Sequence, residues 1–179
     1  HKNHNVRPGS RVALMLPRDY RFPEMVLALN KLGAAYIPID TQFPANRIGH
    51  MISIAQAEHF IVANSLGETL DLNTHMIYME DLDPSNDVDV HILCKADDLL
   101  AIFFTSGTTG IPKGVMITSR QISWGLVSFT HLFHFSTGDL VGLYFSFSFV
   151  GSLIMYGAFY MGSTLRLFNE EEQKNSLLL

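Results

Sequence analysis

The residues best suited to chemistry form one segment rich in glycine and threonine, which reads FTSGTTGIPKG from Phe104 to Gly114. Glycine lets the backbone adopt conformations closed to other residues, so that several N–H groups can converge on phosphate oxygens. Hydroxyl groups add further donors, and the ammonium of Lys113 can follow a polyphosphate. The segment therefore predicts an anion-binding loop built from Gly107, Gly110 and Gly114, the hydroxyls of Thr105, Ser106, Thr108 and Thr109, and Lys113.

The order of residues in this segment excludes a P-loop of the Walker type. That pattern requires Gly-x-x-x-x-Gly-Lys followed by Ser or Thr, whereas Lys113 follows Pro112 and precedes Gly114. The alternative is a polar surface turn without a ligand, which the glycine and threonine content alone would also explain. The order of the whole segment argues against that alternative.

The loop must be held by the elements on either side of it, which alternate between strands and helices. Short apolar runs predict strands at 11–16, 36–39, 59–63, 76–79, 99–104 and 164–168. Apolar residues at helical spacing predict helices at 22–32, 44–55 and 119–133. This alternation is typical of parallel βαβ units with helices covering the sheet. The predicted fold class is therefore α/β, with residues 105–114 as an exposed, mobile loop between a central parallel strand and a helix starting near Ser119.

The stretch from Leu140 to Leu165 contains no charged residue and is longer than the roughly 20 residues that span a bilayer. A membrane anchor over 140–165 is therefore one alternative. Against it, glycines interrupt the stretch, and the alternation FSFSF from Phe145 to Phe149 has the period of two that belongs to a strand. We predict a strand, a turn and a buried helix within the α/β core instead.

Composition limits the partners of the chain. Its 179 residues are 47% hydrophobic and 16% charged, as in folded globular proteins, and its formal net charge is −5. Because no basic face can be found, nucleic acid is not predicted as a partner. Cys94 is the only cysteine, which leaves no disulfide and no paired-cysteine zinc site and fits a reducing, cytoplasmic location. His131 and His134 could share a helix face, but without a third ligand nearby we assign them to packing and predict no metal site.

The loop segment resembles the signature TSGTTGxPKG of the adenylate-forming (AMP-binding) superfamily, which includes acyl-CoA synthetases, luciferases and the adenylation domains of nonribosomal peptide synthetases. A second stretch, LNKLGAAYIPID at 29–40 and FPANRI at 43–48, is similar to a pattern of the peptide-synthetase branch. The resemblance covers about 11–168. It implies that residues 1–179 are the incomplete N-terminal portion of an AMP-binding domain, cut at both ends and without the small C-terminal domain.

The resemblance also implies a two-step reaction. A carboxylate attacks the α-phosphate of Mg-ATP to give an acyl-adenylate and pyrophosphate, and a thiol of CoA or of a carrier domain's phosphopantetheine then takes the acyl group. No catalytic residue is assigned within the chain, because the family keeps its catalytic Lys in the C-terminal domain. Lys113 would offset charge on the leaving pyrophosphate. The residues implied to hold the β- and γ-phosphates of ATP are Thr105, Ser106, Gly107, Thr108, Thr109, Gly110 and Lys113.

Two positions depart from the family pattern. Ser119 stands where a His usually begins the helix after the loop. Residues 146–152, SFSFVGS, resemble the family's SFSFDxS, whose Asp pairs with the substrate amino group in members that activate amino acids. Depending on register, the place of that Asp is taken by Phe149, Val150 or Gly151.

A pocket formed by Phe149, Val150 and Gly151 would suit an uncharged acyl end, because burying an ammonium without a fixed partner costs several kcal/mol. The predicted substrate is therefore an aryl, hydroxy or fatty carboxylate. Two alternatives stay open. One is a catalytically degenerate fold that binds nucleotide or a partner, and the other is the membrane-anchored protein described above.

Overall fold

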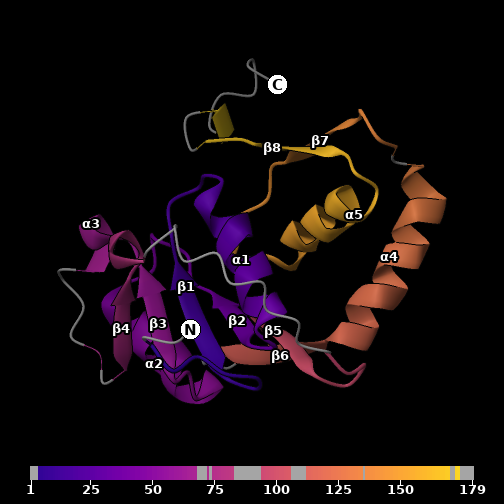
Figure 1. Cartoon of the computed structure of the whole chain (residues 1–179). Helices are drawn as coiled ribbons and strands as arrows, with labels where there is room; N and C mark the ends of the chain where they lie inside the picture. Colours follow the sequence, from indigo (N-terminus) through magenta and orange to yellow (C-terminus); the bar gives the residue numbers. More distant parts are fainter. Residues whose placement is uncertain are drawn as a thin grey trace.

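A computed structural model describes residues 4–67, 72, 74–82, 94–105, 112–134, 136–169 and 172–173. They form a mixed α/β domain in which helices cover a six-stranded sheet (Figure 1). The strands of this sheet are β1 (Arg11–Met15), β2 (Ala35–Pro38), β3 (His59–Val62), β4 (His75–Tyr78), β5 (Leu99–Thr105) and β6 (Lys113–Thr118). A second sheet pairs β7 (Leu140–Leu143) with β8 (Thr164–Leu167). The helices are α1 (Arg21–Lys31), α2 (Ala45–Ala55), α3 (Asn64–Gly67), α4 (Ser119–Phe133) and α5 (Ile154–Tyr160), with 3-10 helices at Met79–Asp81 and Val150–Leu153.

The strand order of the large sheet is β4-β3-β1-β2-β5-β6. Strands β1 to β5 run parallel, and β6 is antiparallel to β5. Helix α1 supplies the crossover between the parallel neighbours β1 and β2, and α2 supplies the crossover from β2 to β3 on the other side of β1. The α/β class predicted from the sequence is confirmed. The carboxyl ends of β1 and β2 therefore share one edge of the sheet, which is where open α/β sheets bind ligands.

Different helices cover the two faces of the sheet. Along β1, Val12 and Leu14 belong to the core on the α1 side, whereas Ala13 and Met15 belong to the core on the α2 side. All four side chains are at most 3% exposed. This alternation is expected of a strand buried on both faces. Helix α1 stops at the predicted place because Gly33 adopts a φ of +69°, a conformation that favours glycine.

The predicted loop at 105–114 was too long at both ends. Thr105 is the last residue of β5, and residues 113–118 form β6, so a strand stands between the loop and α4. Strand β6 was missed because it is an edge strand whose side chains are exposed or only half-buried, which leaves no alternating burial pattern in KGVMIT. The predicted parallel strand at 99–104 is present, with a parallel neighbour on one side only.

The strand predicted from the FSFSF alternation is also wrong. Strand β7 ends at Leu143, and residues 144–149 form an irregular turn. The serines of this turn bond to Asp40 and to each other rather than leaving the backbone to pair in a ladder. Only the middle ring, that of Phe147, is buried.

Within the described residues no helix is long and apolar enough to cross a membrane. The charge-free stretch at 140–165 is divided among β7, the turn, a 3-10 helix, α5 and β8. Helix α5 buries Met155 and Ala158 completely. The predicted turn and helix are present in this part of the chain, but its strands are β7 and β8 rather than the FSFSF segment.

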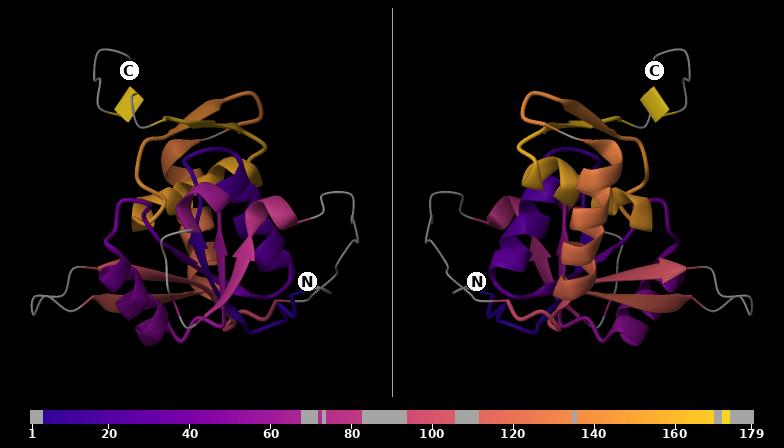
Figure 2. Two further views of the ribbon diagram at one scale, coloured as in Figure 1. Left: turned by 90° about the vertical axis from the view of Figure 1, so that its left-hand side faces the viewer. Right: turned by 90° about the vertical axis from the view of Figure 1, so that its right-hand side faces the viewer.

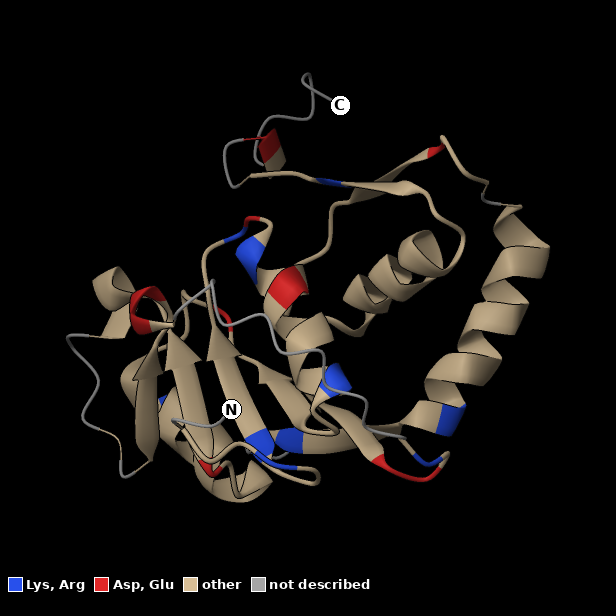
Figure 3. Ribbon diagram, viewed as in Figure 1, with Lys and Arg blue, Asp and Glu red and all other residues tan. Residues whose placement is uncertain are grey.

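Helix α4 lies along one side of the domain, and Figure 3 shows it without charge beyond its first turn. It begins at Ser119 as predicted, where Thr118 and Gln121 form a reciprocal capping box. In its first turn, Arg120 pairs with Asp97 at 3.0 Å. None of its side chains is buried. Its position is thus set by its cap and its contact with α5.

Three histidines meet at the amino ends of β3 and β4, opposite the edge where ligands bind. His59 and His75 are register partners with ring centroids 5.5 Å apart, and the ring of His4 lies 6.0 Å from that of His75. His59 is 7% exposed, and its Nδ1 has no hydrogen-bond partner among the described residues. Burial lowers the pKa of His59 below its ordinary 6.5. The nearby His75, His4 and Arg7 lower this pKa further, whereas Glu58 raises it.

Acidification should therefore weaken the fold through His59. A lowered folded-state pKa means that the unfolded chain binds more protons as pH falls. The contribution of neutral His59 to the free energy of unfolding is therefore complete above pH 6.5 and is lost as pH falls toward the folded-state pKa. Urea unfolding at about pH 7.5 and about pH 5.5 measures this change. His59→Phe should flatten the pH dependence, whereas His131→Asn, at an exposed position on α4, should not. Equal pH dependence in wild type and His59→Phe would contradict the prediction.

Candidate functional site

The predicted phosphate loop lies between β5 and β6, and both of its ends are described. Thr105, at the end of β5, and Lys113, at the start of β6, are cross-strand partners. Partners in an antiparallel pair point to the same face of the sheet, so the hydroxyl and the ammonium lie on one face of the hairpin. Both residues are exposed. The other predicted ligands lie outside the described residues: Ser106, Gly107, Thr108, Thr109 and Gly110.

The hairpin that carries Thr105 and Lys113 packs on the α2 side of the sheet directly beside Lys113. A Cβ atom on Gly114 would stand 3.1 Å from Cγ2 of Ile102, so glycine allows the two strands to pack closely at this point. Ile102 is itself buried on the α2 side of the sheet. Figure 2 shows the far end of the hairpin extending beyond the rest of the sheet. Lys113 therefore reaches solvent from a well-supported strand.

The predicted pocket residues begin with Phe149, the last residue of the 144–149 turn. Phe149 and Val150 are 52% and 46% exposed. At Gly151, a Cβ atom would lie 2.8 Å from Cδ2 of Phe145 and 2.9 Å from Cε1 of Phe149, so only glycine fits beside these two rings without displacing them. The two rings are 5.4 Å apart. The structure thus places two aromatic rings next to the start of the 3-10 helix.

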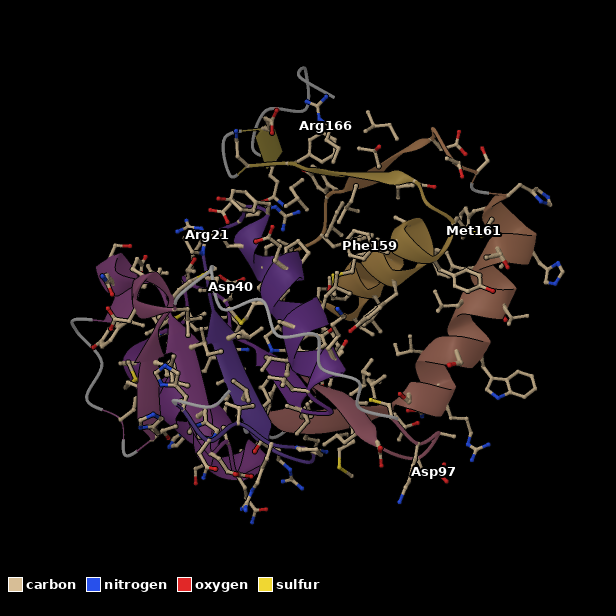
Figure 4. The ribbon with its side chains drawn as sticks, in the orientation of Figure 1. Arg21, Asp40, Asp97, Phe159, Met161 and Arg166 are labelled. Atoms are coloured by element: carbon tan, nitrogen blue, oxygen red, sulfur yellow. The ribbon has the colours of Figure 1, made fainter. Side chains whose placement is uncertain are left out.

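Asp40 is a residue of this region that the sequence interpretation missed. It follows β2 and accepts hydrogen bonds from the hydroxyl of Ser146 at 2.8 Å and from that of Ser148 at 3.4 Å. Its position in the sequence could have identified it. Asp40 is the first charged residue after a buried parallel strand and must therefore lie at the carboxyl edge of the sheet. Figure 4 labels Asp40 at this edge.

Arg18 follows β1 and holds the backbone of the same region. Its guanidinium donates to the carbonyls of Leu143 and Phe145, at 2.5 Å each, and to the carbonyl of Phe168. Its Cζ atom lies 5.1 Å from the centroid of the buried Phe147 ring, which adds a cation–π contact. Arg18 therefore ties the turn and the end of β8 to the end of β1.

Two hollows border these residues. A polar cavity of about 200 Å³ at the carboxyl edge is lined by Arg18, Asp40, Ser146 and Ser148, among others. A largely apolar hollow of about 370 Å³ lies between α4 and α5, and Val150 and Gly151 contribute to its wall. Tyr156 also lines the second hollow. Burial raises the pKa of its phenol, so it stays neutral and donates to Oδ1 of Asn30 at 2.5 Å.

The structure does not gather all predicted site residues in one place. Figure 2 shows the far end of the β5–β6 hairpin apart from α5, which the pocket residues precede. His131 and His134 are exposed on and after α4. Across the described part of the chain, no group of three or more His, Cys, Asp or Glu side chains could hold a metal ion. The chain thus presents two separate surfaces, one carrying Thr105 and Lys113 and one with apolar walls.

Comparison with known proteins connects these surfaces to a family. The family described as AMP-binding enzyme matches residues 2–179. Gramicidin S synthase 2 of Brevibacillus brevis is 33% identical over 97% of the chain, and tyrocidine synthase 3 of Brevibacillus parabrevis is 30% identical over 99%. The chain spans only 4% and 3% of the lengths of these two relatives.

Solved structures agree with this result. The N-terminal subdomain of NpsA from Klebsiella oxytoca, in complex with 3-hydroxyanthranilyl-AMSN, is similar with a TM-score of 0.76 and 26% identity, over 92% of this chain and 41% of that one. The N-terminal domain of FACL13 from Mycobacterium tuberculosis has a TM-score of 0.81 at 24% identity, over 92% and 45%. With the family matched over 2–179, the chain belongs to the AMP-binding, adenylate-forming enzymes and has the fold of part of their N-terminal domain.

Proposed function

We propose that this chain is the N-terminal portion of an adenylation domain that activates a carboxylate with ATP as an acyl-adenylate and passes the acyl group to a thiol. The observation that carries the proposal is the pairing of Thr105 with Lys113 across the exposed end of the hairpin, in a chain of the AMP-binding family. The small C-terminal domain would lie elsewhere in the full-length protein. The thiol would be that of CoA or of a phosphopantetheine carrier domain.

In this proposal the loop binds the polyphosphate of ATP. The hydroxyl of Thr105 and the ammonium of Lys113 are exposed on one face, which fits an anionic ligand. Lys113 stabilises the negative charge that develops on the leaving pyrophosphate. We assign no residue to Mg²⁺, which would arrive with ATP. The remaining phosphate ligands would be Ser106, Gly107, Thr108, Thr109 and Gly110.

The acyl end of the substrate would contact Phe149, Val150 and Gly151. Two of these residues border the apolar hollow between α4 and α5. Figure 3 shows both helices without charge beyond the first turn of α4, so these two helices offer no counter-charge to an ammonium. An aryl, hydroxy or fatty carboxylate is therefore the proposed substrate class.

The full-length protein should prefer acids that lack an α-amine. In ATP–pyrophosphate exchange, matched acids with and without the amine should differ in kcat/KM by at least about tenfold, because an unpaired buried ammonium costs several kcal/mol. The panel should contain aryl, hydroxy and aliphatic pairs. A preference for the amine-bearing member of each pair would refute the substrate class. Absence of exchange with every acid would refute the proposed function itself.

A further inference from the structure

The 144–149 turn has no ladder of its own, so other contacts must fix its shape. Inside the turn, the amide of Phe149 donates to the carbonyl of Ser146 at 3.0 Å, and the two serine hydroxyls lie 3.0 Å apart. The hydroxyl of the buried Ser152 donates to the carbonyl of Phe147 at 3.1 Å. These bonds set the local path of the chain, but none of them ties the turn to the large sheet.

Asp40 supplies that tie through its two carboxylate oxygens. Oδ1 accepts the amide of Gln42 at 3.0 Å, and the carbonyl of Asp40 accepts the amide of Phe43 at 3.1 Å, so the residue is fixed in a tight turn after β2. Oδ2 accepts the hydroxyls of Ser146 and Ser148. Hydrogen bonds to a charged acceptor are stronger than neutral ones. The carboxylate therefore connects a rigid strand end to a turn more than 100 residues later in the chain.

Packing and Arg18 hold the same turn from other sides. The ring of Phe147 stacks on that of Phe22 in α1, with centroids 3.9 Å apart and planes within 5°. Arg18 binds the carbonyls of Leu143 and Phe145, which both precede Ser146. These contacts hold the backbone before Ser146 and the ring of Phe147, whereas the part of the turn from Ser148 onward depends on the serine bonds to Asp40.

We infer that Asp40 is a positioning residue for substrate selection: through Ser146 and Ser148 it sets the direction in which Phe149, Val150 and Gly151 leave the turn. This inference rests on the proposed function, which assigns those three residues to the acyl pocket. Asp40 acts without touching the acyl group. Small displacements of such supports cost binding and rate because the reacting groups must be held in place.

A role as the partner of a substrate ammonium is the main rival for Asp40. A carboxylate has about four lone-pair sites. The amide of Gln42 and the hydroxyl of Ser146 occupy two of them, at 3.0 Å and 2.8 Å, and the hydroxyl of Ser148 lies near a third at 3.4 Å. The occupied sites favour positioning, and the two roles predict different behaviour toward acids with and without an amine.

The test uses the full-length protein and the best acid substrate of the wild type in ATP–pyrophosphate exchange. Asp40→Asn keeps the size of the side chain and removes its charge, and Ser146→Ala removes the shorter of the two hydroxyl contacts. Each should raise the KM for the acid about tenfold while the KM for ATP stays unchanged. The double variant should be no worse than the single ones, because both changes break the same contact. Asp97→Asn is the control, since this acid precedes β5 and pairs with Arg120 in the first turn of α4 (Figure 4).

Three outcomes would overturn the inference. An unchanged KM for the acid in Asp40→Asn would show that the serine bonds to Asp40 do not affect the acyl pocket. A rise in KM confined to amine-bearing acids would make Asp40 an ammonium partner. Parallel losses for acid and ATP, together with a lower melting temperature, would make its role purely structural. If the wild type shows no exchange with any acid, the proposed function fails first, and that result is distinct from these three.

Discussion

Lys113→Ala in the full-length protein should lower carboxylate-dependent ATP–pyrophosphate exchange by about 100-fold without unfolding the domain. The ammonium stands at the exposed end of the β5–β6 hairpin, opposite the hydroxyl of Thr105. Its loss removes a fixed positive charge where negative charge develops on pyrophosphate. Because the side chain packs against little, the melting temperature should change only slightly. Initial rates of exchange and thermal unfolding of the same preparations measure the two effects.

Two further variants separate the role of Lys113 from a general effect of charge. Lys113→Arg keeps the charge but changes its shape, so it should recover part of the activity. Lys95→Ala removes an exposed lysine before β5 and should leave exchange unchanged. If Lys113→Ala exchanged pyrophosphate at the wild-type rate, the phosphate-binding role of this residue would be wrong.

Phe22→Ala should destabilise the domain by about 3–5 kcal/mol. Phe22 is 1% exposed, stacks on Phe147 at 3.9 Å and meets the edge of Tyr36 at 6.4 Å. Truncation would leave a cavity between α1, β2 and the 144–149 turn, which neighbouring rings are too constrained to fill. Chemical denaturation gives the change in the free energy of unfolding.

Leu27→Ala is the matched control for Phe22→Ala, since it lies on the same helix but is 40% exposed. It should cost less than about 1 kcal/mol. Comparable losses in both variants would mean that packing against Phe147 does not set Phe22 apart from an exposed residue of α1.

The sequence predicted the repeated βαβ part of the fold well because its signals are local. Strand β1 is a continuous apolar run buried on both faces, and α2 carries apolar residues at helical spacing. The capping box of α4 marks its start within one residue. Strand β6 was invisible by the same reasoning, because an exposed edge strand pairs through backbone bonds that leave no side-chain pattern.

The candidate site was predictable only where its residues are neighbours in sequence. The loop from Thr105 to Lys113 is one segment, so its chemistry could be recognised before its geometry. Asp40 and Arg18 reach the 144–149 turn through tertiary contacts across more than 100 residues, and no local pattern encodes such a pairing. The alternation FSFSF even predicted a strand where the structure has a turn. The serine side chains bond to Asp40, and the spacing of apolar residues carries no sign of such bonds.

The fastening of the 144–149 turn to β1 and β2 has a consequence for protein engineering. Residues 140–168 look like a self-contained cassette, since β7, α5 and β8 form a unit with its own small sheet. Hydrogen bonds to Arg18 and Asp40 nevertheless hold this unit to the ends of β1 and β2. A chimera that takes these residues from a relative must therefore take the matching residues at positions 18 and 40 as well, or the graft will lack the bonds that hold it to the sheet.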